Sequence, residues 1–161
     1  MIELVSFGPA WRFAVERLWT TAFGSTRAVS NGALHDLLAL PTLVALDDDA
    51  FAGAAAYRFD GAGGCEVVGL ASAIERRGAA TALLEAVTAE ARAVSCRRVW
   101  LVTTNDNVSA FRFYQQRGWH LCALRPDAAT EARATLKPEI PLRGEEGLPV
   151  RDEIEFERRL D

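Results

Sequence analysis

The sequence changes from a strand-like run to a long helix-periodic segment within ten residues, Glu75-Arg76-Arg77-Gly78-Ala79-Ala80-Thr81-Ala82-Leu83-Leu84. The run before this stretch, residues 65–71, is typical of a strand, and residues 79–93 after it carry an apolar stripe at helical spacing. Small residues at a strand-to-helix turn leave backbone N–H groups free at the positive end of the helix dipole. The stretch therefore predicts an anion site for a phosphorylated ligand.

Two familiar phosphate loops do not match this turn. A P-loop ends in Gly-Lys-Ser/Thr, whereas the only lysine of the chain is Lys137, far away. A dinucleotide fingerprint needs three glycines, and this turn has only Gly78. The glycine cluster at residues 61–64 leads into a strand and is typical of a hairpin turn. Gly and Ala before an Ala-rich helix also arise from ordinary close packing, so that alternative stays open at this point.

The turn resembles the pattern Gln/Arg-x-x-Gly-x-Gly/Ala of the GNAT superfamily of N-acetyltransferases, here Glu75-x-x-Gly78-x-Ala80. Glu75 replaces the usual Gln or Arg, which alters one side-chain contact and leaves the backbone donors in place. Residues 104–119 resemble the family's second signature, Asn-x-x-Ala-x-x-Phe-Tyr-x-x-x-Gly-Phe/Trp. The matching residues are Asn107, Ala110, Phe113, Tyr114, Gly118 and Trp119. Two signatures in the family's order and separation argue against coincidence.

The resemblance implies an α/β fold, with a strongly twisted, mixed sheet of about seven strands flanked by helices. In the family the fourth and fifth strands splay apart, and here these are residues 65–71 and 97–103. Residues 1–161 are expected to form a single N-acetyltransferase domain, with a helix-plus-loop insertion at about 126–150 before the last strand. An insertion of this length is often functional.

The apolar periodicity and the turn residues along the chain also predict strands and helices outside the two signatures. A short helix is expected at residues 31–40, and it should end there because Pro41 prevents continuation. The last strand, residues 151–160, is expected at an edge of the sheet with Glu153, Glu155 and Glu157 on one face. The other expected strands are residues 2–7, 42–46, 51–59 and 119–124, and the other expected helices are residues 9–23, 108–117 and 127–136.

Acetyl-CoA is the acetyl donor that the resemblance implies, with its pantetheine arm in the gap between the splayed strands. The coenzyme-binding residues implied in this way are Gly69, Leu70, Ala71, Arg76, Arg77, Gly78, Ala79, Ala80, Thr81, Asn107 and Tyr114. Arg76 and Arg77 could contact the phosphates or belong to a solvated turn. Asn107 is also a helix-cap candidate from its own position in the sequence.

The chemistry of acetyl transfer narrows the catalytic candidates. An alkyl amine has a pKa of ~10.4, so its neutral form costs about 4.6 kcal/mol at pH 7, and a base helps. Glu66, on the strand beside the expected gap, is the candidate base, and a solvated strand glutamate is the alternative. Tyr114 takes the family's tyrosine position, which implies a role as acid or thiolate stabiliser; a packing role is the alternative. No cysteine lies in either signature, which favours direct transfer without a covalent intermediate.

The acceptor expected from the resemblance is a primary amine of a small molecule or peptide. The family's acceptor pocket corresponds here to Trp19, Phe23, His35, Glu153 and Glu155, although the glutamates are equally explained as the wet face of a strand. His35 is expected on a helix surface, and neither His35 nor His120 receives a catalytic role. Competing hypotheses are a non-catalytic coenzyme sensor, an acyltransferase with another acyl donor, and a protein-interaction domain that uses the insertion.

Composition limits the remaining classes. A net charge of −4 and a pI near 5.3 argue against a general nucleic-acid binder. No apolar run approaches the ~18 residues that predict a membrane span, and no signal peptide is recognised at the start. Cys65, Cys96 and Cys122 lack metal-ligand spacing and are expected to be buried, reduced thiols. We therefore expect a cytoplasmic protein without a metal and with no nucleic-acid or membrane partner. A bacterial source and a homodimer are further expectations.

Overall fold

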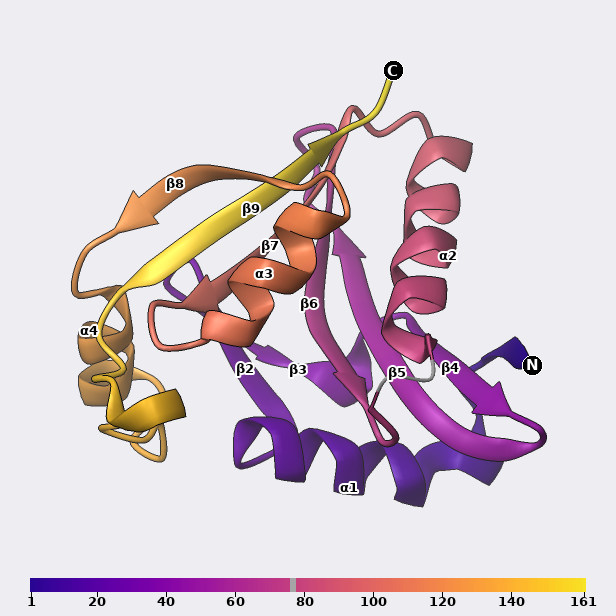
Figure 1. Cartoon of the computed structure of the whole chain (residues 1–161), viewed down its shortest axis with the longest axis horizontal. Coiled ribbons are helices and arrows are strands. Elements are labelled where there is room, and N and C mark those ends of the chain that lie inside the picture. The colour runs from indigo at the N-terminus through magenta and orange to yellow at the C-terminus, as the bar shows by residue number, and fades with distance from the viewer. Residues whose placement is uncertain (76–77) are drawn as a thin grey trace.

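The backbone of the computed structural model is built around a seven-stranded sheet in the order β1-β4-β5-β6-β7-β9-β8 (Figure 1). The structure describes residues 1–75 and 78–161. Adjacent strands are antiparallel except β6 and β7, which are parallel. The strands are β1 (Ile2–Ser6), β4 (Thr42–Asp47), β5 (Ala50–Phe59), β6 (Gly64–Ser72), β7 (Arg98–Thr104), β8 (His120–Arg125) and β9 (Glu153–Arg159). The expected α/β fold with a mixed sheet of about seven strands is confirmed.

Two hydrophobic clusters hold helices to the two faces of this sheet. One face carries α2 (Ala79–Ala93) and α3 (Val108–Gln116), and the stripe of α2 that contains Leu83, Val87 and Ala91 is buried there as expected. The other face carries α1 (Arg12–Phe23), whose Trp19 is fully buried. A fourth helix, α4 (Ala128–Thr135), lies in the expected insertion. The helix periodicity of the sequence thus identified all four helices.

The predicted helix at residues 31–40 is wrong. The chain there forms a hairpin of β2 (Arg27–Ser30) and β3 (Ala33–Asp36), followed by a 3-10 turn at Leu37–Ala39. Asn31 and Gly32 both have positive φ angles, 49° and 77°, and they connect Ser30 to its pairing partner Ala33. An Asn-Gly pair is the strongest short-range hairpin signal, because both residues tolerate the left-handed conformation that a type I′ turn needs. The sequence contained this signal.

The last strand is not at an edge of the sheet. β9 lies between β7 and β8, and β8 forms the edge. Glu153 and Glu155 are buried, at 3% and 8% exposure, so the expectation of a wet face is wrong as well. The thiol prediction is confirmed only for Cys65, which is buried, since Cys122 is exposed on β8. A strand's own alternation does not reveal which neighbours flank it, and here both neighbours come from other parts of the chain.

Candidate active site

A gap opens between β6 and β7 where their pairing stops. The parallel pairing covers only Gly64–Glu66 and Arg98–Trp100, after which the two strands diverge (Figure 1). The pairing of β6 with β5 also shifts register between Val67 and Gly69, so Val68 is the extra residue of a bulge. Diverging strands leave backbone groups without ladder partners, and bulges occur frequently beside active sites. The splayed pair predicted for residues 65–71 and 97–103 is present.

Gly69, Leu70 and Ala71 lie on β6 beyond the last residue that pairs with β7. Gly69 also has a packing role, because a Cβ there would lie 3.2 Å from the Leu37 side chain and 3.3 Å from the Trp19 ring. Because Gly69 has no side chain, β6 can pack closely on Trp19 of α1 at this position. The structure therefore places the three predicted pantetheine contacts along the gap, and their contact with a ligand stays a prediction.

The N-terminus of α2 begins beside this gap. Gly78 is its N-cap, with φ at +83°, and open space surrounds the position that a Cβ would occupy. The first helical bond runs from the Ala82 N–H to the Gly78 carbonyl over 3.0 Å, so the N–H groups of Ala79 and Ala80 precede the helical ladder. These donors form the kind of anion site that the sequence predicts. Arg76 and Arg77 lie outside the described residues.

Arg117 is a basic residue at this site that the sequence interpretation missed. Its Nε donates to the Thr81 Oγ1 over 2.9 Å, and its guanidinium carbon lies 3.7 Å from the centre of the Phe113 ring. The guanidinium therefore lies beside the first turn of α2, where it adds positive charge near the helix N-terminus. Arg117 follows Tyr114 by three residues in the second signature, and only the packing of α3 beside α2 brings it to Thr81.

Asn107 caps α3, as its sequence position predicts. Its Oδ1 accepts a hydrogen bond from the Ala110 N–H at 3.3 Å, and its Nδ2 donates to the Thr103 Oγ1 at 3.0 Å. The side chain thus joins the end of β7 to the start of α3. Both side-chain groups already have partners, so a contact to pantetheine remains a prediction.

Tyr114 lies on α3 and is buried among aromatic rings. Its ring centre is 5.2 Å from that of Phe113, 5.6 Å from that of Trp119 and 5.5 Å from that of Phe156. Burial raises the pKa of the Tyr114 phenol above its ordinary value, and the nearby Arg117 offsets only part of this effect. The phenol therefore stays protonated at neutral pH, the form that can donate a hydrogen bond to a developing thiolate.

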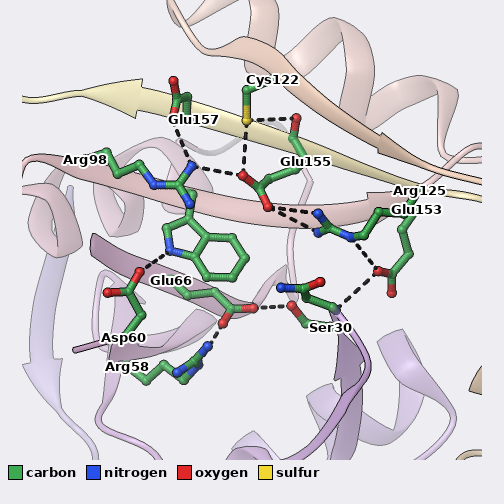
Figure 2. A network of polar contacts seen from close by, with 12 residues as sticks. Ser30, Arg58, Asp60, Glu66, Arg98, Cys122, Arg125, Glu153, Glu155 and Glu157 are labelled. Atoms are coloured by element: carbon green, nitrogen blue, oxygen red, sulfur yellow. Dashed lines mark hydrogen bonds and ion pairs between the residues drawn. The ribbon is translucent and has the colours of Figure 1, made fainter. Parts of the chain in front are cut away.

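Glu66 is fully buried at the point where the β6–β7 pairing ends. Its Oε2 accepts from the Arg58 Nε at 2.7 Å, and its Oε1 accepts from the Ser30 hydroxyl (Figure 2). The predicted alternative of a solvated strand glutamate is wrong. Because Ser30 lies on the hairpin, the Glu66 side chain is on the α1 face of the sheet, whereas Tyr114 belongs to the cluster on the opposite face. The two catalytic candidates thus flank the sheet from opposite sides.

A second group of ion pairs lies between β7, β9 and the end of β8 (Figure 2). Arg98 Nη1 contacts Glu155 at 2.9 Å and Glu157 at 2.8 Å. Arg125 contacts the other oxygen of Glu155 at 3.1 Å and also Glu153 at 3.4 Å. Alternating charges explain how three glutamates of one strand face are accommodated in a partly buried position.

A cleft with a volume of about 450 Å³ lies beside this network. Four segments form it: the turn of the β2–β3 hairpin, the end of β8, one side of α4 and the first residue of β9. The lining residues are Asn31, Gly32, Arg125, Pro126, Ala128, Glu131, Ala132, Thr135, Leu136 and Glu153. Its size is in the range of small-molecule sites, ~300–1,000 Å³. The insertion therefore supplies one wall of a cleft, which the sequence interpretation left open.

The other predicted acceptor residues are distributed unevenly. Trp19 and Phe23 lie on α1 with ring centres 5.7 Å apart, and Trp19 is completely buried, so it belongs to the core. His35 lies on β3 and not on a helix; burial lowers its pKa, and its Nε2 is a buried atom without a hydrogen-bond partner. Ser30 and His35 lie on the same face of the hairpin, because Ser30 pairs with Ala33. That face is the one turned toward Glu66.

Among residues 1–75 and 78–161, no helix is long and apolar enough to cross a membrane. No group of three or more His, Cys, Asp or Glu residues in this part of the chain is arranged to hold a metal ion.

Comparisons with known proteins extend the description of the fold and site. A family model described as "Acetyltransferase (GNAT) family" matches residues 11–119, which contain both signatures. The chain is 47% identical over 109 residues to "Uncharacterized protein YdhI" of Bacillus subtilis (strain 168), covering 68% of this chain and 67% of the relative. It is 40% identical over 114 residues to "Uncharacterized protein YxbD" of the same organism, covering 71% of this chain and 70% of the relative.

Solved structures share the fold over nearly the whole chain. An "IAA acetyltransferase from Bacillus cereus ATCC 14579" superposes with a TM-score of 0.77 at 18% identity, over 99% of this chain and all of the other. A Bacillus subtilis acetyltransferase solved in complex with CoA gives a TM-score of 0.73 at 16% identity, over 99% of this chain and 98% of the other. The family match covers more than half of the residues and includes the gap and the N-terminus of α2. The chain therefore belongs to the GNAT family of acetyltransferases.

Proposed function

We propose that residues 1–161 work as a single N-acetyltransferase domain, which transfers the acetyl group of acetyl-CoA directly to a primary amine of a small molecule or peptide. The observation that supports this most strongly is the gap between β6 and β7, with the open N-terminus of α2 beside it. The fold neighbours solved with CoA and with acetyl-CoA are consistent with the same donor here.

The residues of the gap fit the two chemical parts of acetyl-CoA. The pantetheine arm contains amide groups, which can pair with the main chain at Gly69–Ala71 as a substitute strand would. The pyrophosphate is an anion, which the free N–H groups of α2 and the charge of Arg117 favour. Bound acetyl-CoA supplies a thioester, whose carbonyl carbon is open to attack by a neutral amine.

Glu66 and Tyr114 divide the proton chemistry between the two faces of the sheet. Glu66 is proposed to take the proton of the amine through a water molecule on the hairpin face, where Arg58 and Ser30 hold the carboxylate in one orientation. Tyr114 is proposed to stabilise the departing thiolate on the α3 face with its protonated phenol. The positions of Glu66 and Tyr114 on opposite faces of the sheet suit a reaction in which the amine approaches one side of the carbonyl carbon and the thiolate leaves from another.

The thiols of the protein support direct transfer over a covalent enzyme intermediate. Burial raises the pKa of Cys65 to about 12. Cys122 is exposed as a residue, but partial burial of its sulfur and the hydrogen bond to Glu155 raise its pKa to about 11. Burial also raises the pKa of Cys96. The nucleophilic form of cysteine is the thiolate, which these shifts disfavour at neutral pH.

The test is calorimetric titration of acetyl-CoA into the wild-type protein and the variants Gly78→Glu and Gly61→Glu. Gly61 is the matched control, because it also has a positive φ, +76°, and open space at the Cβ position, but it lies in the β5–β6 turn. We expect micromolar binding that is lost in Gly78→Glu and kept in Gly61→Glu. Absence of binding to the folded wild-type protein would refute the proposal.

Release of free CoA thiol with a panel of amines then tests catalysis. We expect acceptor-dependent release that falls in Tyr114→Phe. Binding without thiol release from any amine would support the coenzyme sensor instead. A comparison of acetyl-, propionyl- and succinyl-CoA with one acceptor identifies the acyl group.

A further inference from the structure

The β2–β3 hairpin connects the gap between β6 and β7 to the cleft that its turn forms with α4. Ser30 of the hairpin reaches Glu66 on β6, and the next residue, Asn31, donates its N–H to the Glu153 Oε1 at 3.2 Å on β9. Glu153 in turn pairs with Thr104 at the end of β7. The hairpin therefore contacts both β6 and β9, and its turn forms one side of the cleft.

Glu153 presents an unused carboxylate oxygen in this cleft. The residue is 97% buried, and both of its donors, the Asn31 N–H and the Arg125 Nε, bind the same oxygen, Oε1. No donor among the described residues binds its Oε2, and this oxygen is not completely enclosed by protein atoms. Because Glu153 lines the cleft, the free oxygen is available to a ligand there. Burial also raises the pKa of this carboxyl, as expected for a carboxylate with few donors.

The positive charge of the basic residue in the cleft is already offset. Arg125 directs its Nε to Glu153 and both Nη atoms to Glu155, at 3.2 and 3.1 Å. Each of its three nitrogens thus contacts a carboxylate, and two negative charges face its single positive charge. Glu131 of α4 also lines the cleft, is exposed, and has no side-chain partner among the described residues. The lining therefore has an excess of negative charge.

Other residues of α4 that line the cleft give it an apolar wall. Ala128, Ala132 and Leu136 are spaced at four-residue intervals and present one side of α4 to the cleft, and Pro126 extends this surface toward β8. An aliphatic chain can pack on such a wall, whereas a strongly hydrated ligand would gain little from it. These residues, Glu131 and Glu153 lie beyond residue 119, where the family match ends.

From these contacts we propose that the cleft binds the acceptor, and that this acceptor is an aliphatic amine with a second positive group held by Glu153 Oε2 and Glu131. The inference rests on the proposed acetyl transfer for the identity of the ligand as an acceptor. It adds a substrate class, namely amines with two cationic ends separated by an apolar chain. Carboxylate-bearing amines are disfavoured, because the arginine of the cleft is already paired.

Direct binding tests the cleft without any catalytic step. Three ligands of equal chain length are titrated into the full chain with CoA present: 1,4-diaminobutane, butylamine and 4-aminobutanoate. We expect the diamine to bind at least about tenfold more tightly than the monoamine, as a charge-assisted hydrogen bond predicts. The amino acid is expected to bind more weakly than either. Equal binding of the three ligands, or preference for the amino acid, would overturn the proposal.

Three isosteric variants assign the effect to the cleft. Glu153→Gln should remove most of the preference for the diamine, and Glu131→Gln, at an exposed site, should reduce it by about two- to fivefold. Glu90→Gln is the matched control, because it removes the same charge from an exposed position on α2 and should keep the preference. Glu131→Gln keeps the test decisive if Glu153→Gln unfolds. An unchanged preference in folded Glu131→Gln and Glu153→Gln would refute the assignment.

The same ligands distinguish this inference from the proposed function. Loss of acetyl-CoA binding or of thiol release with every amine would refute the acetyltransferase proposal, while the diamine preference in direct binding would still stand. Thiol release with butylamine and no advantage for the diamine would leave the transferase intact and refute the substrate class.

Discussion

Replacement of Glu66 by Gln tests the most deeply buried charge of the site. The Glu66 side chain is 1% exposed and lies 2.7 Å from the Arg58 Nε, whereas the Arg58 side chain is 31% exposed. Glutamine keeps the shape, and its NH2 group can donate to the Ser30 hydroxyl while its carbonyl oxygen accepts from Arg58. The hydrogen bond to Arg58 then loses its charged acceptor, and Arg58 loses its counter-charge.

The expected cost follows from these exposures. A hydrogen bond to a charged group contributes about 1.5–3 kcal/mol, and removal of one partner of a fully buried ion pair costs about 3–5 kcal/mol. Water reaches about one third of Arg58 and screens its charge, so we expect about 2 kcal/mol. For a chain of this size, that loss lowers the melting temperature by about 4–8 °C.

Urea denaturation of the wild type, Glu66→Gln, Arg58→Gln and the double variant measures this cost and the coupling between the two residues. We expect a coupling free energy of about 1–2 kcal/mol, because the double variant leaves no unpaired charge. A loss below about 0.5 kcal/mol in Glu66→Gln, together with additive single effects, would refute this account of the ion pair. If Glu66 also takes the proton of the amine, kcat of the folded variant falls by about 10²- to 10⁴-fold, beyond what stability explains.

Three further predictions concern burial elsewhere in the fold. Burial raises the pKa of both tyrosines, Tyr57 and Tyr114, so their phenols should ionise at a higher pH in the folded protein than in the unfolded chain; tyrosinate absorbance that appears at the same pH in both states would contradict this. Lys137 donates from its buried ammonium to two backbone carbonyls at 2.6 and 2.7 Å, so Lys137→Met should destabilise by about 1–3 kcal/mol. Burial lowers the pKa of Lys137, so the unfolded state binds the proton more readily than the folded state. The free energy of unfolding of the wild type should therefore rise with pH toward ~10.4, relative to that of Lys137→Met. Urea denaturation at several pH values measures this difference. Gly69→Ala should lower the free energy of unfolding by about 1–3 kcal/mol, because the added methyl group overpacks against Trp19. A variant that is more stable than the wild type in the same denaturation assay would contradict this, since it would show that the Trp19 ring can move away without cost.

The local parts of the candidate site were predictable because short-range rules determine them. The stripe of α2 and the glycine before it indicated the helix at Ala79–Ala93, and the structure has the same bounds. The Asn107 cap was predictable for the same reason, since it acts on the N–H of a residue three positions further along the chain. The hairpin at residues 27–36 was equally local, and the Asn31-Gly32 turn was its overlooked signal.

The sequence by itself determined the helices, most strands and the two motifs, because periodicity, caps and turns act over a few residues. Only the tertiary structure decided the surroundings of Glu66, which is held by Ser30 from 36 positions away, and the contact of Arg117 with Thr81 across another 36 positions. It also decided that β9 lies inside the sheet, with Glu153 buried beside the cleft. The alternation of a strand shows which residues share a face but not what covers that face, because long-range pairing selects the neighbours.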